Sequence, residues 1–197
     1  TKEQTGVYIR RHIKIHDPST QEIFVDKSNA IHYENMSIAL AQSIANSGHG
    51  FIYNMAFGNG GTAVDPTGII TYLTPNTSGT NASLYNQTYS KVVNQQSSSN
   101  NDPTRNFVET RHLTGQNYTD VFVTCFLDYG EPTGQSAYDT TTAGESAYVF
   151  DELGLQTLDA SGNVMLLTHV IFHPVLKSLN RLIQVDYTVR SEEHTSE

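Results

Sequence analysis

The sequence predicts a mainly β protein: an antiparallel β-sandwich-like domain with one α-helix in its N-terminal half, at about residues 30–46, and long polar loops. Three observations support this prediction. Apolar and polar residues alternate in most of the apolar segments, which is the period of a β-strand. One segment alone has the spacing of a helix. Clusters of Gly, Asn, Ser, Thr and Asp separate the segments, so we expect a single domain over residues 1–189.

The first segment, residues 7–25, predicts a β-hairpin. Four of its apolar residues share one parity: Val7, Ile9, Ile13 and Ile15. Residues 17–20 read Asp-Pro-Ser-Thr, a typical turn sequence, and the apolar residues 23–25 begin a return strand.

The next segment predicts the helix. Ser28 or Asn29 can cap its start, and Asn46-Ser47-Gly48 can end it. Five residues recur at helical spacing, and we expect them to face the core: Tyr33, Met36, Leu40, Ala41 and Ile44.

From residue 50 onward the period of the pattern becomes two, and we expect the sandwich to occupy residues 50–189. A strand over 50–57 leads into the glycine-rich residues 58–62, and a loop-rich region over 58–83 holds a short strand at 69–73. Further strands are expected in order at 84–93, 106–113, 118–129, 147–158, 164–173 and 182–189, with a second polar loop at 130–146.

Composition argues against two classes of partner. The net charge is −9 and the basic residues are scattered, whereas nucleic-acid binding depends on clustered Lys and Arg, so we expect no nucleic-acid partner. No apolar stretch approaches the ~18 residues needed to span a bilayer, and no signal peptide is visible, so we expect no membrane partner. The single cysteine, Cys125, lies in an apolar run and is expected to be buried and inert.

Two histidine pairs have a spacing that chelates zinc on a helix: His12 with His16, and His169 with His173. Both pairs lie in strand-like sequence. At about 3.3 Å per residue, their α-carbons stand roughly 13 Å apart, too far for one ion. We therefore predict no metal site.

No set of residues predicts catalysis or a cofactor. The Gly58–Thr62 loop lacks the Lys-Ser/Thr of a phosphate-binding loop, and no nucleophile elbow is present. Neighbouring acids occur at Asp128/Glu131 and at Asp151/Glu152, and a glycoside hydrolase needs two carboxylates. Because alternating apolar residues make strands here, we expect the paired histidines and acids to face apart. The prediction is no enzyme and no cofactor.

Tyr and Asn crowd the loops, and such surfaces suit recognition because Tyr offers contact area at low entropic cost while Asn offers hydrogen bonds. We expect contacts from loops 58–83 and 130–146 and from the final strand. The candidate contact residues are Asn59, Tyr72, Asn76, Tyr85, Tyr89, Tyr138 and Tyr187.

Several segments, in order, resemble tail-fibre or tail-collar domains of tailed bacteriophages. The helix at 33–46 runs into Gly50-Phe51-Ile52-Tyr53-Asn54-Met55-Ala56-Phe57-Gly58-Asn59-Gly60-Gly61, similar to a strand that ends in a Met-Ala-x-Gly-x-Gly turn. Residues 84–93 stand where that family has an Asn-Glu-x-Tyr-Arg segment, with Gln87 in place of Glu and Ser90 in place of Arg. Residues 150–155 and 159–163 resemble its Glu-x-Gly-Leu strand and turn, and residues 182–189 its closing strand.

The resemblance implies a structural protein of a phage virion at the tail, neck or fibre attachment, assembled in the host bacterial cytoplasm. It implies a homo-oligomer that also contacts other virion proteins. Three alternatives remain: a capsid decoration protein, a module that binds a host surface glycan through its Tyr/Asn loops, and an enzyme that uses the carboxylates. The hairpin at 7–25 and the loops at 94–104 and 130–146 lie outside the resemblance.

The last eight residues, 190–197, read Arg-Ser-Glu-Glu-His-Thr-Ser-Glu and resemble the translation of a common sequencing adapter. We expect this tail to be foreign to the native protein, and we assign it no function.

Overall fold

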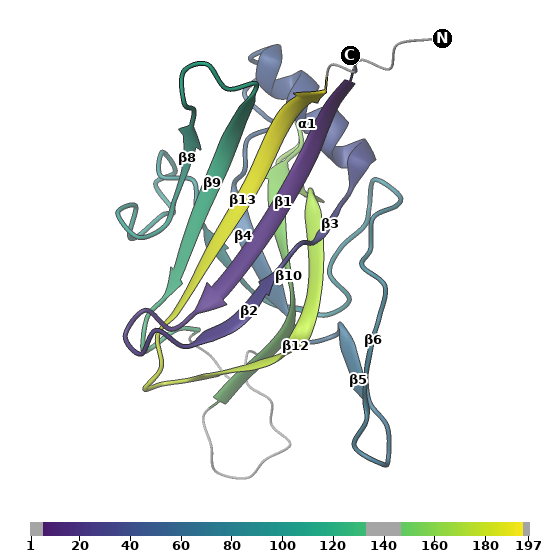
Figure 1. Ribbon diagram of the computed structural model, residues 1–197, viewed down its shortest axis with the longest axis vertical. Coiled ribbons are helices and arrows are strands. Elements are labelled where there is room, and N and C mark those ends of the chain that lie inside the picture. The colour runs from purple at the N-terminus through teal and green to yellow at the C-terminus, as the bar shows by residue number, and fades with distance from the viewer. Residues whose placement is uncertain (1–5, 133–146, 195–197) are drawn as a thin grey trace.

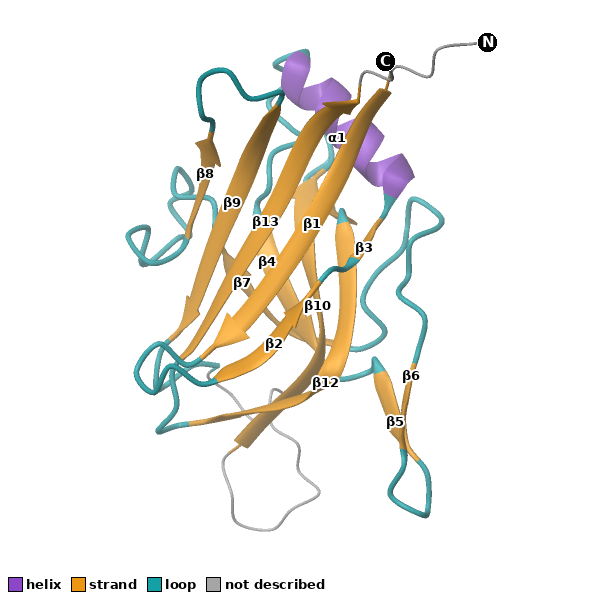
Figure 2. Ribbon diagram, viewed as in Figure 1, coloured by secondary structure: helices purple, strands orange, loops and turns teal. Residues whose placement is uncertain are grey.

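The structure is a computed structural model that describes residues 6–132 and 147–194. The predicted fold class is confirmed: the chain is mostly β, with 49% strand and 7% helix, and its strands pair antiparallel. Two sheets face each other, and one helix lies at an end of the long axis (Figure 2).

The first sheet has the strand order β2-β1-β13-β9-β8. Its strands are β1 (Gly6–His16), β2 (Ile23–Lys27), β8 (Phe107–Arg111), β9 (Tyr118–Leu127) and β13 (Ile183–His194). The predicted hairpin at 7–25 is therefore confirmed as β1 and β2. Strand β13 continues past Val189 and stays in register with β1 as far as the pair Gly6–His194.

The second sheet has the order β3-β12-β10-β4-β7, with β11 pairing on β10. Its strands are β3 (Ala30–Ile31), β4 (Asn54–Gly58), β7 (Gln87–Val92), β10 (Ala147–Leu158), β11 (Val164–Leu166) and β12 (Thr168–Ser178). Strands β5 (Thr62–Val64) and β6 (Ile70–Tyr72) form a separate two-stranded hairpin.

The core lies between the two sheets. Alternate residues of β13 (Ile183, Val185, Tyr187) face Phe57 of β4 and Phe150 of β10 in one apolar cluster. The rings of Phe57 and Phe150 meet edge to face with centroids 5.5 Å apart. Each fully buried side chain of this size contributes about 1.5–3 kcal/mol. Cys125 is buried in the same cluster, as expected.

Helix α1 (Tyr33–Ile44) is confirmed, but its predicted cap and core face are wrong. Strand β3 occupies residues 30–31, so His32 becomes the N-cap, and its side chain accepts the N–H of Asn35. The buried residues are Asn35, Met36 and Ala39, whereas four of the five expected ones are exposed: Tyr33 (65%), Leu40 (47%), Ile44 (85%) and Ala41. The face of α1 that packs on the sandwich is therefore not the predicted one, and Met36 is the only residue that is both predicted to be buried and observed to be buried.

Within the described ranges, no helix is both long and apolar enough to cross a membrane.

The strand expected at 164–173 is two strands, β11 and β12, and the second continues through Pro174 to Ser178. A proline has no N–H to give to a sheet, so inside a sheet it is tolerated mainly at bulges. The pairing of β12 with β10 shifts between Phe150–Val175 and Glu152–Ile171. This bulge accommodates Pro174 and leaves Asp151 without a partner on β12.

Candidate functional site: an anchored arm

Between β4 and β7 the chain makes an excursion, residues 59–86, which we call the arm. It consists of the β5–β6 hairpin and a return segment, residues 73–86. In Figure 1 the hairpin stands off the sandwich near the end of the long axis opposite α1, and the return segment runs back toward the helix. The sequence predicted a loop-rich region here with one short strand, and the partner strand β5 was not expected.

The tip of the arm is an ordered turn. The Oδ1 atom of Asp65 accepts hydrogen bonds from the N–H groups of Thr67 at 2.8 Å and Ile69 at 3.0 Å. Gly68 completes the turn with φ +87°, a conformation that favours glycine. Four large apolar side chains on and beside this hairpin are exposed: Val64, Ile69, Tyr72 and Leu73.

The base of the arm is fixed by Glu152, which is fully buried on β10. Its Oε1 accepts the N–H of Gly60 at 3.0 Å and the N–H of Asn86 at 2.8 Å. Its Oε2 accepts the N–H of Tyr85 at 2.9 Å and Nε2–H of His169 at 2.9 Å. A carboxylate has about four acceptor positions, so this one is fully used. It joins both ends of the arm, at Gly60 and at Tyr85 and Asn86, to the second sheet.

The neighbouring acid, Asp151, holds the same loop. Its Oδ1 accepts the N–H of Gly61 at 2.8 Å, and its Oδ2 accepts the N–H of Thr62 at 2.9 Å and also binds the Thr62 hydroxyl. Consecutive side chains of a regular strand point to opposite faces. The bulge at Asp151 removes that restriction, which is how both carboxylates reach residues 60–62.

The glycines of residues 58–61 are required by close approach. A Cβ on Gly58 would lie 2.4 Å from the carbonyl oxygen of Asn86 and 2.5 Å from Oε1 of Glu152. A Cβ on Gly60 would lie 2.8 Å from the Asn86 nitrogen. The backbone must come this near for its N–H groups to reach the buried acids. These glycines therefore allow the loop to bind the carboxylates of Glu152 and Asp151, and not an external phosphate.

His169 is fully buried beside Glu152 and is held in one tautomer. Its Nδ1 accepts the N–H of Asn76 at 2.7 Å, so Nε2 carries the proton that is donated to Glu152. The expectation that the histidines and acids face apart is wrong for this pair. In the β10–β12 register Glu152 pairs with Ile171, and His169 stands two residues before Ile171 on β12, so the side chains of Glu152 and His169 lie on the same face as diagonal neighbours.

Burial by itself would raise the pKa of Glu152. The hydrogen bonds from His169, Asn86, Tyr85 and Gly60 all favour the charged form, and together they lower the pKa below its ordinary value of 4.5. The carboxylate is therefore ionised at neutral pH, as the four donors require.

The return segment is fixed at its far turn by the start of α1. The buried side chain of His32 donates from Nε2 to the carbonyl oxygen of Gly79 at 2.7 Å. The Asn35 amide donates to the carbonyl of Leu166 at 2.9 Å, and it also contacts that of Thr80 at 3.5 Å. The arm is thus attached at its base and at the turn of its return segment, residues 79–80, while the β5–β6 hairpin projects from these attachments.

The other residues predicted from spacing stay apart. His12 binds Asp26 and His16 binds Asp186, each on the outer face of the first sheet. His173 is exposed and lies 3.3 Å from the Tyr72 hydroxyl. Among the described residues, no group of three or more His, Cys, Asp or Glu could hold a metal ion.

The acids Asp128 and Glu131 share one turn but bind different cations. Asp128 pairs with Arg105 at 3.0 Å, and Glu131 pairs with Lys91.

The candidate contact residues fall in four different places. Asn59, Tyr72, Asn76 and Tyr85 all lie on the arm, and the Tyr85 ring lies 5.6 Å from that of His169. Tyr89 is half-buried on β7 and packs against Phe57. The prediction of Tyr187 as a contact residue is wrong, because its side chain lies in the core and is fully buried. Tyr138 lies outside the described residues.

The sequence did not single out the Glu152–His169 pair. The signal lies in Gly58–Gly61 and in Asp151-Glu152, and the sequence does not show that these two segments meet. Comparison of the chain with family models, curated proteins and solved structures gives no match.

Proposed function

We propose that this protein is a structural subunit that associates head to tail with copies of itself, as part of a tailed-phage particle at the tail, neck or fibre base. The observation that carries the proposal is a pair of exposed apolar surfaces at opposite ends of the molecule. One is the tip of the arm and the other is the outer face of α1 with the start of β1 (Figures 1 and 2).

One surface projects and carries an acid, whereas the other is hollowed and carries arginines, of which Arg10 also pairs with Glu192 at 3.1 Å. The arm tip presents Val64 and Ile69 around the exposed carboxylate of Asp65. At the other end a hollow of about 690 Å³ is lined by six residues: Val7, Tyr8, Ile9, Arg10, Arg11 and Tyr33. A projecting apolar tip with one acid suits an apolar hollow with two arginines. Different surfaces on the two partners make a heterologous contact, which builds rings or stacks.

The anchoring of the arm suits this task. A flexible loop would lose conformational entropy on docking, whereas an arm already fixed by Glu152, Asp151 and His32 loses little. The hydrogen bonds at its base are made to main-chain N–H groups, so they position the hairpin independently of which side chains lie at its tip.

The resemblance to tail-fibre and tail-collar domains supports the particle assignment. Three of the segments that carry it, residues 50–61, 84–93 and 150–155, meet at a single point, because Glu152 binds Gly60, Tyr85 and Asn86. The segments that carry the resemblance are therefore the ones that hold the base of the arm.

Sedimentation velocity on three proteins tests the proposal. We expect the wild-type chain to associate. An arm variant, Val64→Lys with Ile69→Lys, places cations where they meet Arg10 and Arg11 and should sediment as a monomer. A helix variant, Leu40→Glu with Ile44→Lys, keeps a favourable i, i+4 pair and should also be a monomer. Mixed together, the two variants should form a one-to-one dimer and nothing larger, because each retains one working surface.

Leu113→Lys is the matched control, since Leu113 is exposed by 67% in the β8–β9 turn, which belongs to neither surface. It should associate as the wild type does. A wild-type chain that stays monomeric at all concentrations, or mixed variants that fail to pair, would contradict head-to-tail docking. Locating the subunit in a map of the particle separates the tail, neck and fibre base from the alternative role on the capsid surface.

A further inference from the structure

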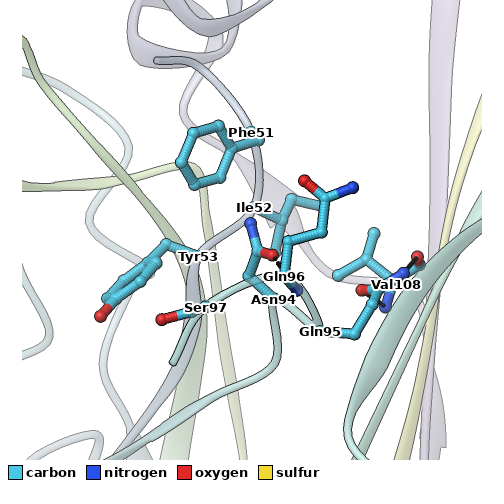
Figure 3. A pocket seen from close by; sticks show the side chains of 8 residues that line it. All are labelled: Phe51, Ile52, Tyr53, Asn94, Gln95, Gln96, Ser97 and Val108. Carbon is cyan, nitrogen blue, oxygen red and sulfur yellow. Dashed lines mark hydrogen bonds between the residues drawn. The ribbon is translucent and has the colours of Figure 1, made fainter. Parts of the chain in front are cut away.

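A cleft of about 500 Å³ lies between the segment that leads into β4, the turn after β7 and strand β8 (Figure 3). Its size is within the ~300–1,000 Å³ range of small-molecule sites. Eight residues line it: Phe51, Ile52, Tyr53, Asn94, Gln95, Gln96, Ser97 and Val108. None of them belongs to the arm, to α1 or to β1.

The lining contains no charged side chain. It combines two aromatic rings, three carboxamides and one serine hydroxyl. A carboxamide carries both donors and acceptors, which matches the hydroxyl groups of a sugar, each of which also donates and accepts. An aromatic ring offers an apolar face for the C–H side of a sugar ring. In Figure 3 the rings of Phe51 and Tyr53 project to the same side of their segment, while Ile52 points away.

The floor of the cleft is rigid. The side chain of Gln95 donates to the carbonyl oxygen of Val108 at 2.8 Å and accepts its N–H at 3.1 Å, as a neighbouring strand would. The Oδ1 of Asn94 accepts the N–H of Gln96 at 2.8 Å, and the Asn94 N–H donates to the carbonyl of Tyr53 at 3.1 Å. These bonds fix the turn before any ligand arrives.

Other polar groups of the cleft remain free for a ligand. Within the described part of the chain, the Gln96 carboxamide and the Tyr53 hydroxyl make no hydrogen bond, and Phe51 is 40% exposed. An exposed aromatic ring beside unused neutral donors and acceptors is what a saccharide needs. An anionic ligand would find no cation here, and the net charge of −9 would oppose it.

We infer that this cleft binds a neutral saccharide, with Phe51 and Tyr53 as the stacking surface and Asn94 and Gln96 as the hydrogen-bonding groups. The site differs from the arm, so a particle that carries many copies would present many such clefts. Weak single sites then add up through multivalency.

The test is a glycan array probed with the full chain, followed by calorimetric titration of the best neutral oligosaccharide. We expect hits among neutral gluco-, galacto-, manno- or N-acetylhexosamine oligosaccharides. Phe51→Ala and Gln96→Ala should each weaken binding at least tenfold. Tyr129→Ala and Gln116→Ala are matched controls, an exposed aromatic and an exposed amide outside the cleft, and should leave binding unchanged.

The arm variant Val64→Lys with Ile69→Lys should bind the same oligosaccharide with the same single-site affinity, which separates this inference from the assembly proposal. Three results would overturn it: no neutral glycan bound, hits that require sialic acid or sulfate, or binding that survives Phe51→Ala and Gln96→Ala together. Circular dichroism on both variants checks that the fold is retained.

Discussion

Gly58 and Glu152 face each other across the β4–β10 ladder, and the side chain of Glu152 fills the space that a Cβ on Gly58 would need. The glycine is needed here because Oε1 of Glu152 passes Gly58 to reach the N–H groups of Gly60 and Asn86. A small residue on one strand thus makes room for a buried charge on the next.

Gly58→Ala should destabilise the protein. The added methyl would lie within 2.5 Å of Oε1 of Glu152 and of the Asn86 carbonyl oxygen. Relief is limited because the Asn86 oxygen belongs to the backbone and the Glu152 carboxylate is held by four hydrogen bonds. Overpacking of this kind costs about 1–3 kcal/mol. The measurement is urea unfolding followed by tyrosine fluorescence. Gly130→Ala is the control: nothing lies within 4 Å of its Cβ, so its midpoint should match the wild type.

Glu152→Gln should lower the free energy of unfolding by about 3 kcal/mol, because it removes a buried charge from four donors. The new amide would also direct its own N–H groups at donors. Glu22→Gln, at an exposed acid 3.7 Å from Arg181, should change stability by less than about 1 kcal/mol. Equal effects of the two substitutions would show that the buried network is unimportant.

The same variant reports the pH dependence of Glu152. Its pKa is lowered in the folded state, so it stabilises the protein above its unfolded pKa of about 4.5, and this contribution is lost as the pH falls toward the folded value. We expect the difference in stability between wild type and Glu152→Gln to be largest at pH 7 and to shrink below pH 4.5. Unfolding midpoints at pH 7, 5, 4 and 3 measure it. A difference that stays constant with pH would refute the assignment.

Lys177 should behave in the opposite sense. It is 1% exposed on β12, and burial lowers its pKa to about 8, although Glu131, Asp128 and Asp17 nearby oppose the shift. Between that value and its unfolded pKa of 10.5 the unfolded chain binds more protons, so wild-type stability should rise with pH over this window. Lys177→Met should be more stable than wild type by about 1–3 kcal/mol at pH 7. Calorimetry at pH 7, 9 and 10 should show that gain disappearing, and Lys14→Met, on the outer face, should show no such trend.

The sequence predicted the fold well where local pattern decides it. The strands expected at 147–158 and 118–129, the hairpin at 7–25 and the helix all follow from periodicity, although the second strand ends at Leu127. The prediction failed where tertiary contacts decide. The face of α1 that is buried depends on where β3 ends, and β12 continues through Pro174 because a bulge accommodates it.

The anchored arm shows the same limit. Spacing along one strand correctly separated His169 from His173, but it could not reveal that His169 on β12 lies beside Glu152 on β10. Contacts between strands depend on register, which no single segment contains. The glycines at 58, 60 and 61 became interpretable only with the acids that lie against them.

The acids at the base of the arm bind mainly backbone amides, so the contacts that hold the arm do not depend on the side chains that the hairpin presents. Residues 63–71 contribute no atom to the carboxylate contacts of Asp151 or Glu152. The hairpin can therefore be exchanged for another of equal length without disturbing its support. Related chains could acquire a different binding partner by replacing residues 63–71 alone. A foreign hairpin could be grafted at the same position by design.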